Sequence, residues 1–331
     1  MRALPALLLL SSLFALDPGK SPNFRFAVAG DSRGNDEGIN RAVLEDLRDG
    51  LLTDQVSLVL FPGDLVTGPK DHETMVRYFK AWNQTFAAPL RKAGIPVYPC
   101  RGNHDLVKVE AGADALAAWK EVILAENPVP ANGPATELGF TYAVAAGENL
   151  FLSLDVYGSN RMRTDTRWLG SLLATNKLPH IFAFSHVPLY NLAGKAAHPD
   201  GYGWTSQGSN KFQSREERDG LVGLLTKAGA DAYFCGHDHW LDVAAVPQNT
   251  GRLFWQFLSG GAGAPIRTWS QGGYRDPQVS NVGHADQFGY MVAEVGREAT
   301  VVTVRERVGE HSFTNWAPIR VPHSKAAQRL R

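Results

Sequence analysis

Five apolar runs in the sequence end in short motifs of Asp, Asn and His, residue types that bind metal ions and move protons. In chain order the motifs are Gly30-Asp31, Gly63-Asp64, Gly102-Asn103-His104-Asp105, Ser185-His186 and Gly236-His237-Asp238-His239. Oxygen and imidazole nitrogen donors suit ions of the Zn, Mn or Fe type. Cys is absent from the pattern, which argues against a structural zinc site. Because His237 and His239 are two residues apart, one turn of chain can offer ligands to two adjacent ions.

Alternating strands and helices are predicted to position the first three motifs. Apolar runs predict strands at 24–29, 56–61 and 95–100, and helical periodicity predicts helices at 36–49 and 71–88. Each motif then lies at the carboxyl end of its strand. Open α/β sheets bind ligands at that edge, so we expect the motifs to converge there.

The remainder of the chain is predicted to hold a hairpin, further helices and a β-rich tail. Strands are expected at 140–145, 150–157, 180–185, 230–235, 253–258, 290–295 and 299–304, and helices at 114–126, 165–175 and 214–229. Residues 190–213 follow His186 and show no periodicity. A loop of this length is usually functional or disordered, and we interpret it as a lid or specificity insert.

Taken together and in this order, the motifs resemble the metallophosphoesterase superfamily, in particular its calcineurin-like and purple-acid-phosphatase-like members. The family pattern is GD, GD, GNHD or GNHE, H and GHxH, and the resemblance extends from residue 24 to about residue 265. It implies an α/β fold, a β-sandwich of two mixed sheets flanked by helices. No linker divides residues 21–331, so we expect one metallophosphoesterase domain there.

The resemblance also implies the chemistry. A phosphate ester would be hydrolysed by a hydroxide that bridges two divalent or trivalent metal ions, Fe, Mn or Zn. The two ions would share one carboxylate and take the other motif residues as separate ligands. The first ion would bind Asp31, Asp64 and His239, and the second would bind Asp64, Asn103, His186 and His237.

Three further residues are expected to act on the substrate. By the same resemblance, His104 would lie near the leaving group as a general acid or hydrogen-bond donor, and Asp105 would orient His104. We expect Arg33 to contact the phosphate, because a planar guanidinium matches phosphate oxygens. A structural salt bridge is the alternative role for Arg33.

Two positions depart from the family pattern, and both concern the first metal ion. Many members have a His two residues after the first motif's Asp, where this chain has Arg33, a permanent cation that cannot ligate. Purple acid phosphatases place a Tyr three residues after the second motif's Asp, where this chain has Thr67. The first ion would then bind weakly, or be completed by water or by a residue such as Asn35.

The charge composition of the chain gives no indication of nucleic acid as a binding partner. The 331 residues include 33 Lys and Arg against 33 Asp and Glu, so no basic excess indicates nucleic acid binding. We expect a phosphorylated small molecule or another phosphoester as substrate, with a phosphomonoesterase first and a phosphodiesterase second. A non-catalytic binding protein with a degenerate first metal site, or an enzyme with a single metal ion, remains an alternative because of Arg33.

The N-terminus has the pattern of an exported protein. Met1-Arg2 precedes an apolar run from Ala3 to Leu16, which is shorter than the roughly 20 residues that cross a bilayer. We therefore expect residues 1–20 to be a signal peptide or an N-terminal anchor, and the mature chain to be secreted or periplasmic without a membrane span. If the run is not a signal, the protein is cytoplasmic.

Cys100 and Cys235 are expected as buried free thiols, or as a disulfide if their strands are neighbours.

Overall fold

The structure, a computed structural model, describes six stretches of the chain. They are residues 24–69, 71–106, 113–157, 164–190, 215–268 and 279–324. The expected signal segment, 1–20, lies outside these residues, as does the expected lid, 190–213, except for Tyr190. No helix among the described residues is long and apolar enough to cross a membrane.

The first sheet has seven strands around a parallel centre. The parallel strands are β1 (Phe24–Val28), β3 (Leu58–Pro62) and β4 (Val97–Cys100). Antiparallel strands from the C-terminal part extend the sheet from β1: β12 (Gly289–Val295), β13 (Ala299–Gly309), β14 (Ser312–Asn315) and β15 (Ile319–Pro322). The spatial order is β14-β13-β12-β1-β3-β4, with β15 also paired to β13.

The second sheet also has seven strands and also mixes both directions. Its order is β11 (Ser280–Ala285), β9 (Leu241–Pro247), β10 (Leu253–Ser259), β8 (Ala232–Cys235), β7 (His180–Phe184), β6 (Asn149–Ser153) and β5 (Tyr142–Ala146). Strands β6, β7, β8 and β10 are parallel to one another. The carboxyl ends of parallel strands therefore carry motifs in both sheets.

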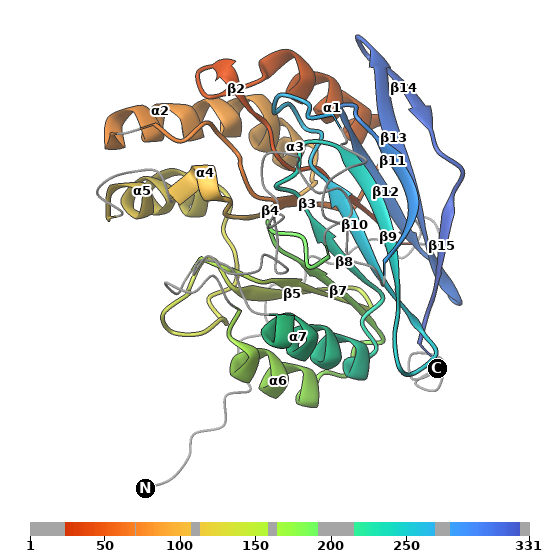
Figure 1. The fold of residues 1–331 in the computed structure, drawn as a ribbon. Helices are drawn as coiled ribbons and strands as arrows, with labels where there is room; N and C mark the ends of the chain where they lie inside the picture. Colours follow the sequence, from red (N-terminus) through yellow and green to blue (C-terminus); the bar gives the residue numbers. More distant parts are fainter. Residues whose placement is uncertain are drawn as a thin grey trace, which may run out of the picture.

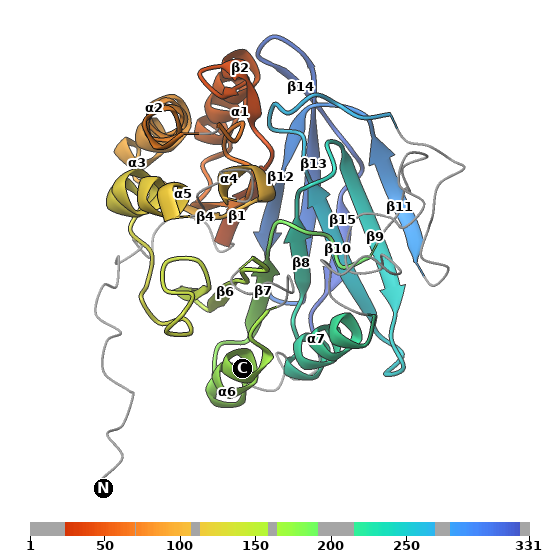
Figure 2. The ribbon, with the colours of Figure 1, turned by 60° about the vertical axis from the view of Figure 1, so that its left-hand side comes forward.

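Helices cover the outer side of each sheet (Figures 1 and 2). The group on the first sheet is α1 (Arg41–Asp54), α2 (His72–Trp82), α3 (Ala88–Lys92), α4 (Asn103–Leu106) and α5 (Ala113–Ala118), with π-helical turns at 83–87 and 119–124. The second sheet is covered by α6 (Thr166–Thr175) and α7 (Arg215–Ala228). The expectation of two mixed sheets flanked by helices is confirmed.

An aromatic core holds the two sheets face to face. Phe26 of β1 lies 5.0, 4.8 and 5.6 Å, between ring centroids, from Phe151, Phe182 and Phe234 of the second sheet. All four rings are fully buried. Aromatic pairs at these separations add to the hydrophobic gain of burying each ring, so the facing surfaces fix one sheet against the other.

Some elements differ from the sequence prediction. Helix α1 begins at Arg41 instead of residue 36, because the side chain of Asn40 caps it by accepting from the Val43 N–H at 3.5 Å. The residues before it form the short strand β2 (Arg33–Asp36), which bridges to Ile39. Cys100 and Cys235 are buried free thiols, on strands of different sheets.

Candidate metal centre

The predicted site residues come from segments that directly follow strands of both sheets. Asp31 follows β1, Asp64 follows β3, and the motif from Asn103 follows β4. His186 follows β7, and the His237–His239 turn follows β8. The structure thus brings these loops to one edge of the sandwich, as the strand-end argument predicts.

Backbone hydrogen bonds lock the loops to one another. The N–H of Asp31 donates to the Gly63 carbonyl at 3.0 Å, and the N–H of Ser32 donates to the Asp64 carbonyl at 3.0 Å. From the second sheet, the Ser259 carbonyl accepts from the Gly30 N–H at 2.9 Å. The loops that carry the carboxylates are therefore tied to one another and to the second sheet by backbone hydrogen bonds.

Three of the predicted ligands have a backbone conformation that L-residues rarely adopt. The φ angles are +64° at Asp31, +52° at Asp64 and +75° at His237. Non-glycine residues in this region cost free energy and persist where the surroundings hold them, which is typical of functional sites.

The glycines of two motifs allow backbone to approach carboxylate. A Cβ on Gly102 would lie 2.2 Å from Oδ1 of Asp64, and a Cβ on Gly236 would lie 2.1 Å from Oδ2 of Asp31. In the space so left, the His104 N–H donates to Oδ1 of Asp64 at 2.8 Å, and the His237 N–H donates to Asp31 at 2.9 Å. Glycine at these positions is therefore a requirement of the site.

Four side chains converge at the second predicted metal position. Nε2 of His186 and Nδ1 of His237 lie 3.1 Å from each other and each 3.1 Å from Oδ1 of Asn103, while Oδ1 of Asp64 lies 3.4 Å from the His186 nitrogen. Donors bound to one Zn-sized ion at about 2.0–2.2 Å stand roughly 3.0–3.5 Å apart. The separations among Asn103, His186 and His237, and that between His186 and Asp64, therefore match a shared ion.

The hydrogen-bond chemistry of that position also fits a cation. Nδ1 of His186 lies 2.9 Å from the Pro62 carbonyl, which can only accept, so the Nε2 atom presents a lone pair. Burial lowers the pKa of His186, which favours the neutral ring. Since the Asn103 oxygen is also an acceptor, lone pairs face one another, and a metal ion is the group that such an arrangement fits.

The first predicted position contains the expected ligands and one additional cation. Ligand atoms of Asp31, Asp64 and His239 lie within 4.8 Å of one another. The guanidinium of Arg33 lies among them, with Nη2 3.0 Å from Nε2 of His239 and Nε 3.5 Å from Oδ2 of Asp64. The donor types suit a metal ion, but the guanidinium already occupies the lone pair of His239. This position does not fit a metal ion in the way that the second one does.

Burial and neighbouring charges set the ionisation of the cluster. Burial, reinforced by the nearby Asp64, raises the pKa of Asp31 well above its usual value. The pKa of Asp64 is lowered, because His186, His104 and other partners outweigh the opposing effect of burial. Burial, with the charges of Arg267 and Arg33, lowers the pKa of His239 to about 3, so this imidazole is neutral.

His104 and Asp105 lie beside the metal position. Nε2 of His104 is 4.0 Å from Oδ2 of Asp64. The carboxylate of Asp105 accepts from the backbone N–H groups of Leu65 at 3.0 Å and Gly102 at 2.7 Å. Asp105 thus joins the two segments that carry Asp64 and His104, and its expected role in orienting His104 stays a prediction.

Thr67, which stands where purple acid phosphatases have a Tyr, and Asn35, a suggested substitute ligand, both lie on or against strand β2. Thr67 donates its hydroxyl to the Gly34 carbonyl at 2.9 Å and so serves the β2 turn. Asn35 is exposed on β2, whereas Asp31, Asp64 and His239 are buried. Sequence reasoning missed the carbonyls of Pro62 and Pro265, which accept from His186 and His239 at 2.9 and 2.8 Å, because a carbonyl has no sequence signature.

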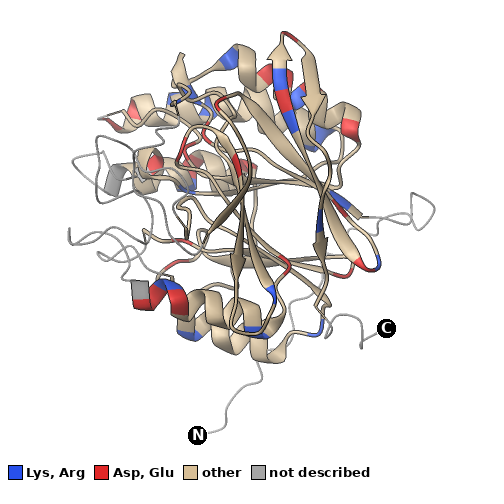
Figure 3. Cartoon of the chain, turned by 45° about the vertical axis from the view of Figure 1, so that its right-hand side comes forward, with Lys and Arg blue, Asp and Glu red and all other residues tan. Residues whose placement is uncertain are grey.

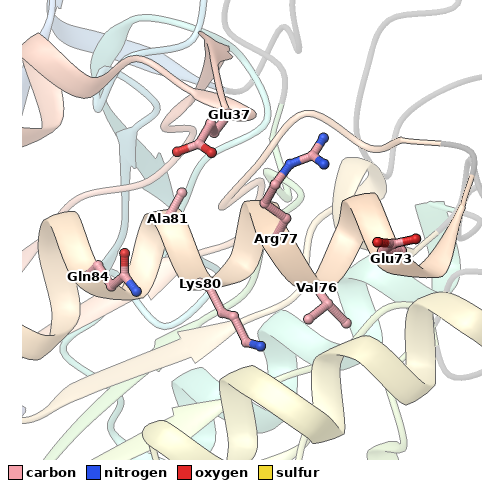
Figure 4. Close-up of a pocket in the computed structure, with 7 residues that line it drawn as sticks. All are labelled: Glu37, Glu73, Val76, Arg77, Lys80, Ala81 and Gln84. Carbon is pink, nitrogen blue, oxygen red and sulfur yellow. The ribbon is translucent and has the colours of Figure 1, made fainter.

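A second group of possible ligands lies elsewhere in the structure. His180, Asp231 and His323 are buried together, with Nδ1 of His180 3.4 Å from Oδ2 of Asp231. A hollow on the surface of α2, lined by residues that include Glu37, Arg77 and Lys80, is also separate from the predicted site (Figure 4). Neither the His180 group nor this hollow includes a residue of the five sequence motifs, so we do not assign the site to either of them.

Comparison with known proteins assigns the family. The model of the calcineurin-like phosphoesterases matches residues 24–241, about two thirds of the chain. The chain belongs to the calcineurin-like phosphoesterase family. Membership supports phosphoester hydrolysis in general, by a family that uses two metal ions as a rule.

Solved structures show the same fold at low sequence identity. Purple acid phosphatase PPD1 from yellow lupin (Lupinus luteus) seeds is 15% identical with a TM-score of 0.67, covering 94% of this chain and 56% of its own. GAP50 of Plasmodium is 14% identical with a TM-score of 0.60, covering 94% of each chain. A dimetal phosphatase from Danio rerio is 14% identical with a TM-score of 0.53, covering 92% of this chain and 100% of its own. The chain thus spans little more than half of the lupin enzyme, and a search of curated proteins found no match.

Proposed function

We propose that the protein is a metal-dependent phosphatase that hydrolyses phosphate monoesters. The observation that carries the proposal is the convergence of Asn103, His186 and His237, whose donor atoms lie 3.1 Å from one another, with Asp64 3.4 Å from His186. These four residues would hold the metal ion of the second site. A bound ion of this kind lowers the pKa of water and stabilises charge on a phosphoryl group. The two-metal scheme also expects a first ion at Asp31, Asp64 and His239. The guanidinium of Arg33 contacts two of these three residues and so argues against that ion.

The chain's own residues would complete the chemistry. His104 lies next to Asp64 and would donate a proton or hydrogen bond to the departing alcohol oxygen. Arg33 would offset charge on the phosphoryl oxygens, since its guanidinium lies between the Asp64 and His239 side chains and 16% of the Arg33 side chain is exposed. Asp105 would hold the loop of His104 in place through its backbone hydrogen bonds.

The choice between monoester and diester can be tested on one pair of substrates. The purified chain, supplied with Mn, Zn or Fe, is assayed on an aryl phosphate monoester and on the matching diester. The proposal predicts turnover of the monoester with a higher kcat/KM than that of the diester. Turnover of the diester alone would replace the proposal by a phosphodiesterase, its nearest alternative.

A non-catalytic binding protein is the second candidate. One neighbour, GAP50, is described as the anchor in the inner membrane complex of Plasmodium, and the departure at Arg33 alters the first metal position in this chain. Absence of turnover on both esters, in a folded chain that contains metal, would favour this candidate. Intact His104 and an intact second metal position support the enzyme instead.

We further propose that residues 1–20 direct export, so that the mature enzyme works outside the cytoplasm. The supporting observation is the charged start and short apolar run of the N-terminus. Fractionation of expressing cells, with intact-mass measurement of the product, would give a shortened chain in the exported fraction. A full-length chain confined to the cytoplasm would contradict this proposal.

A further inference from the structure

Arg33 reaches the ligand atoms that a first metal ion needs. It begins β2 directly after the Asp31 loop, and its side chain turns inward, with 16% of it exposed. Nη2 lies 3.0 Å from Nε2 of His239, and Nε lies 3.5 Å from Oδ2 of Asp64. The guanidinium therefore contacts two of the three residues that would hold the first ion.

The contact with His239 uses the lone pair that a metal ion would need. Nδ1 of His239 lies 2.8 Å from the Pro265 carbonyl, which can only accept, so Nδ1 carries the hydrogen and Nε2 is the free acceptor. A guanidinium has only donors, so Arg33 donates to that atom. One nitrogen lone pair serves one partner, and here its partner is Arg33.

The charges at the first metal position also argue against a metal ion beside Arg33. Asp31 and Asp64 are both buried, and a guanidinium is a permanent cation that balances buried carboxylate charge. A divalent ion held between the same carboxylates and His239 would stand next to this cation and be repelled by it. At the second site, by contrast, Asn103 and His186 direct acceptor atoms toward one point, and Nδ1 of His237 lies 3.1 Å from each of them.

We infer that the guanidinium of Arg33 stands in place of the first metal ion, so that the chain binds one metal ion, at Asp64, Asn103, His186 and His237. The inference rests on the proposed function, because it concerns the same site. Arg33 would then offer to the phosphoryl oxygens the positive charge that a first ion supplies in two-metal members of the family. Asp31 and His239 would position Asp64, the His237 turn and Arg33 instead of ligating.

Metal content of the full chain tests the inference without an activity assay. Wild-type protein and Arg33→His are loaded with excess Mn, desalted and analysed for metal per folded chain. We expect one ion in the wild type and two in Arg33→His, because the imidazole removes the cation and adds a ligand. Arg25→His is the matched control, since Arg25 forms an exposed pair with Glu294, and we expect one ion.

The electron paramagnetic resonance spectrum of bound Mn gives a second readout. An isolated ion is expected in the wild type and an exchange-coupled pair in Arg33→His. If Arg33→His fails to fold, His239→Ala and His237→Ala locate the ion: it should persist in the first variant and be lost in the second. Two ions in the wild type, or loss of the ion in His239→Ala, would overturn the inference and leave the proposed function standing. A folded wild type with no bound metal would instead refute the proposed function.

Discussion

At the scale of single residues, the site depends on which atoms of a few side chains face inward. His186 and His239 each donate Nδ1–H to a proline carbonyl, at 2.9 and 2.8 Å, which turns Nε2 of each toward the carboxylates. The Asp, Asn and His motifs were visible in the sequence because these residue types recur at strand ends. The sequence also indicated a place for Arg33 at the site, but not its contact with His239, because that contact joins residues 206 positions apart.

His104 gives the first prediction. Replacement by Ala should lower kcat by about 10²- to 10⁴-fold, because the departing alcohol loses its proton or hydrogen-bond donor. Metal content should not change, since the described ligands of the second site do not include the imidazole. Parallel assays and metal analysis check this, with His311→Ala as control, whose side chain is 64% exposed. An unchanged kcat would remove His104 from the proposed machinery.

Gly102 gives a prediction about the space beside Asp64. In Gly102→Ala the new Cβ would meet Oδ1 of Asp64 at 2.2 Å, so the carboxylate must shift and metal affinity should fall. Gly223→Ala is the matched control, because nothing lies within 4 Å of its Cβ position. In helix α7 that change should stabilise the fold by about 0.5–1 kcal/mol. Metal titration and thermal unfolding compare the two, and equal metal affinity would contradict the account.

At the scale of elements, caps and short polar strands account for the differences between prediction and structure. Helix α1 starts where Asn40 can cap it, a choice that hydrophobic periodicity alone does not make. Strands β11 and β14 are mostly exposed or half-buried, so they lack the apolar signal that revealed the buried strands β3 and β7. The strands that carry motifs were therefore the most predictable part of the fold.

The attachment of β11 to β9 gives a prediction of pH dependence. His284 lies 3.3 Å from Asp242 and 2.7 Å from Asp286, and although burial opposes its charge, these carboxylates raise the pKa of His284. A raised pKa stabilises the fold fully below the unfolded value of about 6.5, and this stabilisation is lost as pH rises through the folded pKa. The free energy of unfolding should fall over that interval, and His284→Gln should weaken the dependence. A variant with the wild-type pH profile would refute this role.

At the scale of the whole molecule, the site exists only when both sheets are in register. Asp31, Asp64 and Asn103 come from the first sheet, whereas His186, His237 and His239 come from the second. The sequence predicted two sheets through the family resemblance, but their register follows from packing between residues distant in the chain. Positions of Lys and Arg are interspersed with positions of Asp and Glu along the described helices and strands (Figure 3), in keeping with the balanced total charge.

The core between the sheets gives the prediction at this scale. Phe26→Ala removes the ring that contacts Phe151, Phe182 and Phe234, and should cost about 3–5 kcal/mol of stability. Val308→Ala is the control, because Val308 is 62% exposed and should change stability by less than about 0.5 kcal/mol. Denaturant unfolding measures both. A loss near that of the control would mean that this contact does not hold the sheets together.

The most direct test of the central claim is removal and return of the metal. The purified chain is stripped with a chelator until no metal remains, checked for retained fold, and assayed on an aryl phosphate monoester before and after addition of Mn, Zn or Fe. The account predicts no turnover in the stripped protein and recovery with at least one of these ions, because the donors of Asp64, Asn103, His186 and His237 converge on a cation position. Full turnover by the metal-free chain would contradict it.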